Sequence, residues 1–453
     1  MIGTRLLVFA AALAVIVSTR DTRHFHVRAR KQSRGDMPMN RTRLTSLCFG
    51  ASLALAVAGG ARADAVTDWN QTAVRATEIA GAPVPVQTRA MSIVHAAMFD
   101  AVNAVVRKYT SYAVDIRAPE ASAEVAAAAA AHGILVRLYP PQKPITDLAL
   151  AGTLAKVPDG PAKEQGLRLG QEVAEKLFAM RKDDGASAQA SYTFSSGPGA
   201  YQATPPMNMN PVLPQWRSVT PFLIKPFTAN SPGQFSFAGP PDVTSAAFAK
   251  DFDEIKRLGS RASTERTTEQ TAVAIHWAGS EVPPFNAIAR AASATKSLSL
   301  IDNARLFALL NMTMADSLIV GFEAKYAFNF WRPVTAIRNA SLANNVALAA
   351  DAGWEPLLVS PPHQEYPSAH CLGAGAAVAV LLDVFGGDAT SASYVYPPLG
   401  ILRRWTSFGQ IATEVENARV WGGIHYRTAV EHGTVVGRQI AEFALKTTMR
   451  PAN

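Results

Sequence analysis

The sequence predicts an all-α protein, a set of helical bundles interrupted by one long irregular region. Apolar residues recur at intervals of three or four over most of the chain beyond residue 89, which is the period of a helix with one buried face. Many of these stretches are rich in alanine, the strongest helix former. In none of them do apolar and polar residues alternate as in a half-buried strand, so we expect no β-sheet.

The expected helices share this period and differ mainly in length. They span residues 90–106, 124–138, 145–155, 162–180, 245–258, 264–278, 286–292, 298–327, 370–385, 410–421 and 428–446. Between residues 183 and 242, Ser, Gly, Pro and aromatic residues follow one another without a period, which predicts a long loop or lid and a boundary between two regions. We therefore divide the chain into an N-terminal helical region, 64–242, and a C-terminal helical domain, 243–453.

Residues 1–63 are predicted to be an export leader. They contain two basic and apolar segments, and the second ends in Ala61-Arg-Ala-Asp-Ala65, which has the small residues of a signal-peptide cleavage site. We expect translation to start at Met37 or Met39 and the mature protein to be periplasmic or secreted. The alternative is an uncleaved anchor formed by the first apolar segment, residues 6–17.

Charge and cysteine content narrow the classes of partner. The leader holds ten of the 43 basic and two of the 35 acidic residues, so the rest of the chain carries 33 of each. A neutral body offers no electrostatic footprint for a polyanion, and we expect no nucleic-acid partner.

Residues 306–322 and 372–382 are apolar but interrupted or short, so we expect core helices and no membrane span after the leader. Cys371, alone in the body, forms no internal disulfide.

The first of three segments that carry chemistry runs from Lys325 to Pro333. Lys325 and Arg332 are seven residues apart, almost two helical turns, which predicts that both cations leave one helix face and that the helix ends at Arg332. Two cations on one face indicate an anion, although a solvated pair explains this segment equally well. Asp316, on the same helix, is either a partner of these cations or a carboxylate satisfied by backbone groups.

The second segment runs from Pro361 to His370 and leads into an apolar helix. Ser368 is expected at the N-terminus of that helix, where its hydroxyl and the free backbone N–H groups form a cradle for an oxyanion. His370 is expected in the first helical turn, facing the cradle. A plain N-capping serine and a structural histidine are the alternatives, and they are favoured when the segment is taken alone.

The third segment runs from Arg419 to His425. The glycines Gly422 and Gly423 break a helix, so that the guanidinium and the imidazole approach one point. A surface arginine and a capping histidine are the alternative. When the three segments are taken together, a functional site is favoured over the separate structural alternatives. Three cations, a helix N-terminus and two histidines are the components of a site for a phosphate-like anion with acid–base or nucleophilic chemistry.

In order and spacing, the segments resemble the superfamily that joins vanadium-dependent haloperoxidases to type 2 phosphatidic acid phosphatases and class A acid phosphatases. Its signature is K-x6-RP, then PSGH, then SR-x5-H-x3-D. This chain reads K-x6-RP from Lys325, PSAH at Pro367–His370 and AR-x5-H from Arg419. It is also similar, more weakly and over most of the body, to exported bacterial haloperoxidase-like chains. The resemblance implies a fold of helical bundles.

The resemblance implies a role for each matched residue. The implied ligands of vanadate, or of phosphate in a phosphatase, are Lys325, Arg332, Ser368, Arg419 and the backbone N–H of Ala369. His425 would be the axial vanadium ligand or the nucleophile of a phosphatase, and His370 the acid–base group. His363 matches a pocket residue linked to halide choice, and a histidine there is similar to the bromide-oxidising members; a histidine exposed in a Pro-rich loop is the alternative.

Three alanines depart from the signature. Ala369 replaces its glycine, Ala418 its serine, and Ala429 its aspartate four residues after His425. Neither Glu431 nor the histidine after it lies on the face that would replace this aspartate, so we expect His425 to lack a carboxylate partner. A histidine that attacks phosphorus needs that partner more than one that donates a lone pair to vanadium, which favours vanadate.

We therefore expect an exported, vanadate-dependent haloperoxidase that oxidises bromide or a similar halide with hydrogen peroxide. The alternatives are a secreted acid phosphatase that hydrolyses phosphomonoesters through a phosphohistidine, and a degenerate anion-binding protein without activity. All expected partners are small molecules. The halide or ester and the oligomeric state stay open.

Overall fold

The computed structural model describes residues 64–225 and 235–452, so the predicted leader, residues 1–63, and its start at Met37 or Met39 lie outside the described residues. Apart from one hairpin and three isolated bridges, the regular secondary structure of the described residues is entirely helical, which confirms the all-α class. Its helices are α2 (Ala65–Ile79), α3 (Val84–Val106), α4 (Ala123–Leu138), α5 (Lys143–Leu154), α6 (Pro161–Arg181), α7 (Ala246–Leu258), α8 (Thr268–His276), α9 (Val282–Lys296), α10 (Leu300–Phe328), α11 (Pro333–Arg338), α12 (Ala369–Phe385), α13 (Phe408–Trp421) and α14 (Arg427–Thr447). Short 3-10 turns lie at η2 (Pro140–Gln142), η3 (Pro214–Ser218) and η4 (Ala340–Ala343).

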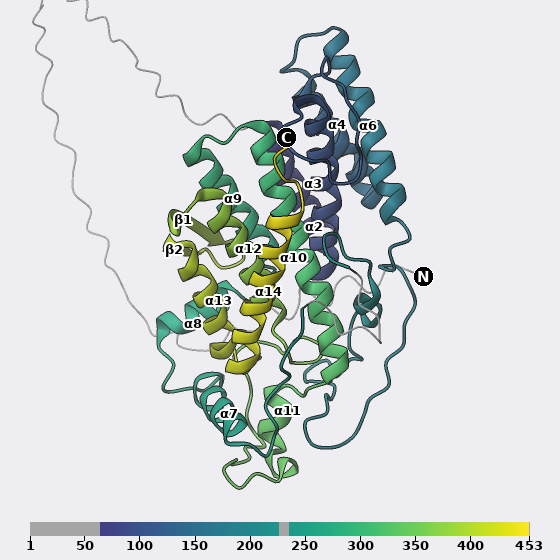
Figure 1. Ribbon diagram of the computed structural model, residues 1–453. Coiled ribbons are helices and arrows are strands. Elements are labelled where there is room, and N and C mark those ends of the chain that lie inside the picture. Colours follow the sequence, from purple (N-terminus) through teal and green to yellow (C-terminus); the bar gives the residue numbers. More distant parts are fainter. Residues whose placement is uncertain (1–63, 226–234, 453) are drawn as a thin grey trace, which may run out of the picture. The chain divides into compact units, whose positions relative to one another are not determined.

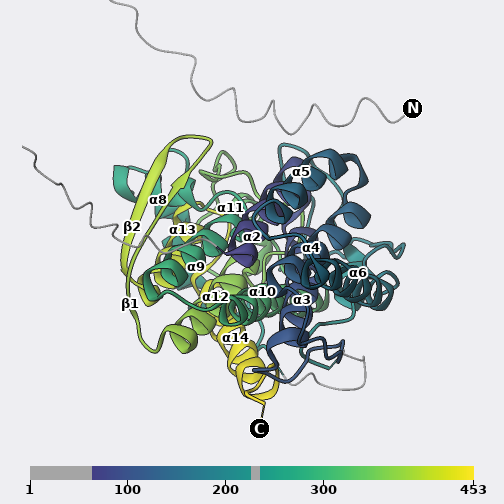
Figure 2. The same ribbon diagram turned by 90° about the horizontal axis from the view of Figure 1, so that it is seen from above.

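Helix α10 is the centre of the arrangement. It packs against α3 on one side and α12 on the other, and α4 and α6 continue beyond α3 while α14 continues beyond α12 (Figures 1 and 2). By length and composition α10 is apolar enough to cross a membrane, but 94% of its most apolar stretch of 18 residues is buried inside the protein. A helix that is hydrophobic all round is buried, and this one is the core helix of the fold.

Helices α12 and α14 run in the same direction and touch backbone to backbone. A Cβ atom at Gly375 would collide with the carbonyl oxygen of Thr434, and one at Gly437 would collide with that of Leu372. Only glycine allows this approach. Near their first turns, the N–H of Ser368 donates to the carbonyl of Ala429 at 3.1 Å. The N-termini of both helices therefore lie side by side.

Every predicted helix is present, although some ends shift by several residues, and α2 and α11 were not predicted. The expectation that there is no sheet was wrong. Strands β1 (Ala389–Tyr396) and β2 (Ile401–Ser407) pair in an antiparallel hairpin. Only Ala392 and Trp405 are buried in these strands, so the sequence shows little of the alternation that marks a strand with one buried face.

The irregular region predicted for residues 183–242 is confirmed for its described residues, where η3 is the only helical turn. The boundary placed at residue 242 stays a prediction. Asp316 of α10 fixes this region to the core, because its carboxylate accepts hydrogen bonds from the backbone N–H groups of Phe222, Leu223 and Ile224 at 2.7, 2.7 and 3.2 Å. Of the two interpretations of Asp316, the structure supports satisfaction by backbone groups.

Replacing Asp316 with alanine should lower the free energy of unfolding by roughly 3 kcal/mol or more, because each buried N–H left without a partner costs about 1–3 kcal/mol. Asp316→Asn, which keeps a carbonyl acceptor, should lose less. Urea unfolding measures both, with Asp383→Ala at an exposed position of α12 as control. Wild-type stability of Asp316→Ala would show that the carboxylate does not anchor residues 222–224.

Candidate anion-binding site

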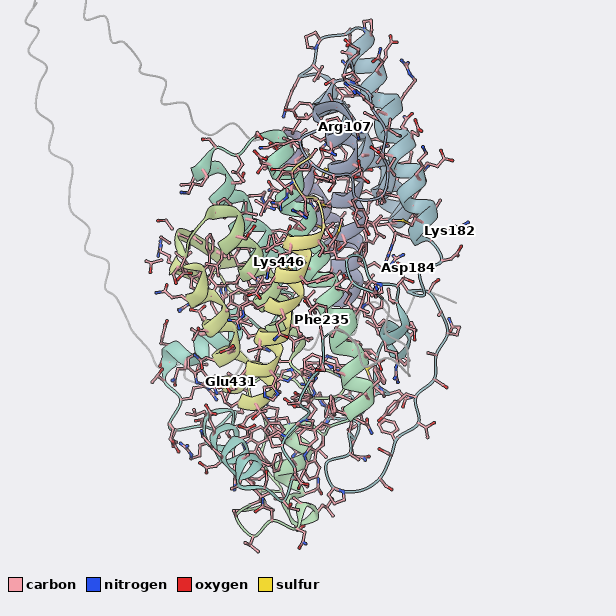
Figure 3. The ribbon with its side chains drawn as sticks, viewed as in Figure 1. Arg107, Lys182, Asp184, Phe235, Glu431 and Lys446 are labelled. Carbon is pink, nitrogen blue, oxygen red and sulfur yellow. The ribbon has the colours of Figure 1, made fainter. Side chains whose placement is uncertain are left out.

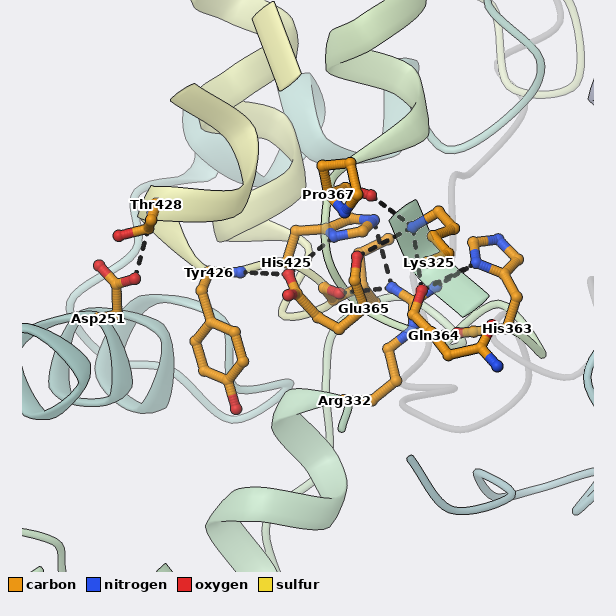
Figure 4. A network of polar contacts seen from close by, with 11 residues as sticks. Asp251, Lys325, Arg332, His363, Gln364, Glu365, Pro367, His425, Tyr426 and Thr428 are labelled. Carbon is orange, nitrogen blue, oxygen red and sulfur yellow. Dashed lines mark hydrogen bonds and ion pairs between the residues drawn. The ribbon is translucent and has the colours of Figure 1, made fainter. Parts of the chain in front are cut away.

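Lys325 and Arg332 lie in one cluster, but they do not share a helix face. Helix α10 ends at Phe328, and Asn329 adopts the left-handed conformation with φ of 50°. Arg332 is instead the N-cap residue of α11, which begins at Pro333. The predicted end of the helix at Arg332 was wrong, since asparagine tolerates the left-handed residue that closes a helix earlier. The loop after α10 nevertheless returns Arg332 to the ammonium of Lys325 (Figure 4).

The ammonium of Lys325 is fully buried and holds the loop that leads into α12. It donates to the backbone carbonyls of Gln364, Glu365 and Pro367. An ammonium has three donors, so none is left over for an anion in this arrangement. Burial, reinforced by the charge of Arg332, holds the pKa of Lys325 well below its usual value.

The guanidinium of Arg332 joins the first segment to the other two. Its Nε donates to the carbonyl of His363 at 2.8 Å and its Nη2 lies 3.0 Å from His363 Nδ1. Its Nη1 donates to the carbonyl of Ile424 at 2.7 Å and lies 3.2 Å from His425 Nε2. Burial lowers the pKa of Arg332 to about 10, which leaves it charged at neutral pH. The structure thus places His363 in the cluster, with its ring 5.5 Å from that of Phe322.

Arg419 brings a third cation from the last turn of α13. Its Nη1 donates to the carbonyl of Trp277, while its buried Nε has no hydrogen-bond partner in the described part of the chain. Burial lowers the pKa of Arg419 to about 10. Within residues 64–225 and 235–452, no carboxylate forms an ion pair with Arg332 or Arg419. A buried donor without a partner is rare, and here it belongs to a cation without a counter-ion.

Ser368 is the N-cap residue of α12, as the second segment predicted, but its hydroxyl makes no capping bond. This buried hydroxyl has no hydrogen-bond partner among the residues that the structure describes. The first N–H groups of a helix, here beginning with that of Ala369, have no partner within the helix. The hydroxyl and the start of α12 are therefore both able to donate to an oxyanion.

His370 lies in the first turn of α12 and faces the segment before α9. Its Nε2 lies 2.8 Å from the carbonyl oxygen of Gly279 and 3.5 Å from the carboxylate of Glu281. Because a carbonyl only accepts, Nε2 carries the ring proton and Nδ1 is left for proton exchange. Burial, together with the nearby charge of Arg419, holds the pKa of His370 well below its usual value.

Glu281 is one residue of this site that the sequence did not reveal. It is fully buried, neither of its carboxylate oxygens has a hydrogen-bond partner, and burial raises its pKa to about 7. It stands immediately before α9, outside the three segments. Its burial beside His370 is the only feature that marks it, and burial depends on how α9 packs rather than on local sequence.

His425 follows the break at Gly422 and Gly423, as predicted. It also has a carboxylate partner, which was not predicted. Its Nδ1 lies 2.9 Å from Glu365 Oε1. The two side chains are 2% and 0% exposed. The expectation that His425 lacks a carboxylate was therefore wrong. The partner comes from the loop before α12, sixty residues earlier, and its position in the motif loop, three residues before Ser368, is the sequence signal that could have found it.

The region after His425 offers no second carboxylate. Ala429 is buried in an apolar cluster with Trp331 and Tyr366. Glu431 is exposed on α14 (Figure 3), and His432 bonds to the hydroxyl of Tyr366 at 2.6 Å. As predicted, neither Glu431 nor His432 replaces the aspartate of the signature.

The cluster as a whole is buried and cationic. It contains three histidines, His363, His370 and His425. Burial holds the pKa of each imidazole well below its usual value, and the neighbouring cations lower it further. Neutral imidazoles, three basic side chains and two carboxylates leave an excess of positive charge. Buried charge is costly unless it is compensated, so the cluster is suited to bind an anion with several oxygens.

Comparison with known sequences agrees with this geometry. The family described as the VCPO second helical-bundle domain matches residues 305–453. Vanadium chloroperoxidase of Curvularia inaequalis is 27% identical over 398 residues, and the match covers 70% of this chain. It covers 65% of that protein, so the chain spans less than two thirds of the length of this relative.

Two solved structures share the fold. A bacterial vanadium-dependent iodoperoxidase gives a TM-score of 0.74 at 24% identity, covering 86% of this chain and 97% of the other. The apo form of a bacterial vanadium-dependent chloroperoxidase gives a TM-score of 0.65 at 18% identity, covering 80% and 92%. Residues 305–453, which hold the three motifs in one buried cluster, thus match the VCPO second helical-bundle domain, and the chain as a whole shares the fold of the bacterial vanadium-dependent haloperoxidases.

Proposed function

We propose that the protein is an exported, vanadate-dependent haloperoxidase that oxidises a halide with hydrogen peroxide. The observation that carries this proposal is a pair of buried donors without partners, Arg419 Nε and Ser368 Oγ, in a cluster that has more cations than carboxylates. The names of the relatives, which are vanadium haloperoxidases, support vanadate as the anion.

The residues present fit a tetrahedral oxyanion. In our proposal, the donors that would hold it are Arg332, Ser368, Arg419, the backbone N–H of Ala369 and, through charge, Lys325, and His425 would bind it through Nε2. When bound, vanadate supplies a Lewis-acid centre for peroxide that needs no change in the oxidation state of the metal. Because the carbonyls of the loop occupy Lys325, this lysine acts mainly by fixing the loop and adding charge.

The protein's own part in the reaction is charge compensation and proton transfer. Arg332 and Arg419 offset negative charge where water is excluded, and there each contact is stronger than in solvent. The free Nδ1 of His370 is the nitrogen that gives or takes a proton. His425 presents its Nε2 to the cluster, because its Nδ1 is engaged by Glu365.

Bromide, or a similar halide, is the substrate that we propose from His363. This histidine is bonded to Arg332 and lies against Phe322, so an aromatic wall and a cation meet beside the cluster. The solved relatives are an iodoperoxidase and a chloroperoxidase, so their names do not select a halide and this part of the proposal rests on His363.

Glu365 favours a second candidate function, a secreted acid phosphatase acting on phosphomonoesters. A histidine nucleophile is oriented by a carboxylate on its other nitrogen, and Glu365 occupies that place at 2.9 Å. The argument against hydrolysis from Ala429 is thereby removed. Phosphate in place of vanadate would use the same donors.

One experiment separates the two functions. Purified metal-free protein is assayed for peroxide- and bromide-dependent halogenation with and without added vanadate, beside hydrolysis of p-nitrophenyl phosphate without vanadate. Halogenation that depends on vanadate is expected. Strong hydrolysis with no vanadate-dependent halogenation would overturn the first function in favour of the second.

Export is part of the proposal, and it rests on the leader pattern in residues 1–63. N-terminal sequencing of the protein from its native cells should find cleavage after Ala63 or Ala65. A mature chain that retains residues 6–17 would contradict cleavage.

Replacing Arg419 with alanine should weaken the binding of both vanadate and phosphate about ten- to a hundredfold, because a charge-assisted hydrogen bond contributes about 1.5–3 kcal/mol. Calorimetric titration with each anion measures the loss. Arg404→Ala, on the exposed face of β2, is the matched control and should bind like the wild type. Unchanged affinity in Arg419→Ala would move the anion site elsewhere.

A further inference from the structure

We infer that Glu365 is a positioning residue that sets the tautomer and orientation of His425. Its carboxylate accepts a hydrogen bond from Nδ1, and this leaves the lone pair of Nε2 directed into the cationic cluster. The superfamily signature places a carboxylate four residues after this histidine, whereas here it comes from the loop before α12. The inference rests on the proposed function only in taking His425 as the residue that acts on the anion.

The geometry around Glu365 Oε1 is the first support. This oxygen lies 2.9 Å from His425 Nδ1 and accepts the backbone N–H of Tyr426 at 2.9 Å. Tyr426 is the N-cap residue of α14. One buried oxygen therefore holds both the imidazole and the start of the helix that follows it (Figure 4).

The far side of the imidazole gives an independent assignment of the same tautomer. Arg332 Nη1 lies 3.2 Å from His425 Nε2. A guanidinium has donors but no acceptor, so Nε2 must be the acceptor and bear a lone pair. The neutral ring then carries its proton on Nδ1, where Glu365 accepts it. Contacts on opposite sides of the ring agree on which nitrogen is unprotonated.

The backbone of Glu365 is itself fixed from both directions. Its N–H donates to the carbonyl of Phe330 at 3.0 Å, and its carbonyl accepts from Lys325 Nζ at 3.0 Å. Ala429, at the place of the signature aspartate, is 1% exposed and packs in an apolar cluster. A rigid loop therefore supplies the carboxylate that the helix after His425 does not.

The test combines the tautomer of His425 in the anion-free protein with the affinity for two anions. Nitrogen-15 NMR of labelled histidine reports which ring nitrogen carries the proton, and calorimetry reports binding of orthovanadate and of inorganic phosphate. The variants are Glu365→Ala, which removes the acceptor, and Glu365→Gln, whose side-chain carbonyl can accept the same two bonds. Asp251→Asn is the matched control, since this buried carboxylate bonds the N–H of Thr428 and does not touch the imidazole.

We expect the proton on Nδ1 in the wild type, in Glu365→Gln and in Asp251→Asn, and a mixture of tautomers in Glu365→Ala. Vanadate affinity should fall about 10–100-fold in Glu365→Ala, as is typical when the partner of a metal-bound histidine is removed. Phosphate affinity should change much less, because the arginines and the start of α12 remain.

Several outcomes would overturn the inference. A wild-type His425 with its proton on Nε2 would do so without any variant, even if Glu365→Ala failed to fold. An unchanged tautomer in Glu365→Ala would do the same, as would an equal loss of vanadate and phosphate affinity, which would indicate general damage to the cluster. Failure of the proposed function is a different result, namely no vanadate-dependent halogenation by the wild type, and the NMR measurement still decides the role of Glu365 in that case.

Discussion

His425→Ala should abolish halogenation and collapse the affinity for vanadate, while phosphate still binds weakly. The variant removes the Nε2 lone pair that faces Arg332, through which His425 would bind vanadate. Arg332, Arg419 and Ser368 stay in place, so an anion that needs no bond to His425 retains most of its contacts. Calorimetry with both anions and a bromide oxidation assay measure the two effects.

His432→Ala is the matched control for this change. His432 also lies on α14, but it bonds to Tyr366 and stands outside the anion cluster. It should keep wild-type vanadate affinity. In a phosphatase, by contrast, His425→Ala would leave substrate binding nearly intact and remove turnover together with any phosphohistidine. Intact halogenation in His425→Ala would contradict the role proposed for His425.

The second large effect is expected for His370→Ala, which should slow turnover by about 10²–10⁴-fold and leave anion affinity nearly unchanged, as is typical when a general acid or base is lost. Burial and Arg419 depress the pKa of His370, so its ring is neutral near pH 7 before an anion binds. The negative charge of a bound anion favours the protonated ring. The acid form is lost as the pH rises, and the wild-type rate should therefore fall on the alkaline side.

The pH profile distinguishes this role from a structural one. His370→Ala should lack the alkaline decline that the wild type shows, whereas His132→Ala, on α4 and paired with Asp147, should keep both the rate and the profile. A variant that loses anion affinity along with turnover would show that His370 holds the cluster together instead of transferring protons.

What the sequence predicts here depends on how local the cause is. The start of α12 at Ser368 and the break at Gly422 follow from residues within a few positions, and both were predicted. The helical period ended the helix at residue 327, one residue before the end of α10, whereas the motif spacing wrongly extended it to Arg332, because the left-handed conformation of Asn329 is one of several that asparagine adopts. The hairpin was missed because only Ala392 and Trp405 are buried in it.

The two carboxylates of the site were missed for another reason. Glu365 meets His425 across sixty residues, and Glu281 reaches His370 from the start of a different helix. The position of Glu365 in the motif loop marks it as a candidate, but both pairings exist only once α9, α12 and α14 have packed. Conversely, three motifs in the correct order were enough to gather the cations, since the superfamily fold brings them together.

The glycine contact between α12 and α14 ties the two helix starts of the proposed anion site together through the main chain. Because the two backbones touch at Gly375 and Gly437, a side chain at either position would push the helices apart and would displace Ser368 from the start of α14. His363 belongs to a loop and takes no part in this contact. On our proposal, an exchange at position 363 would therefore change the choice of halide and leave the donors at the helix starts in place.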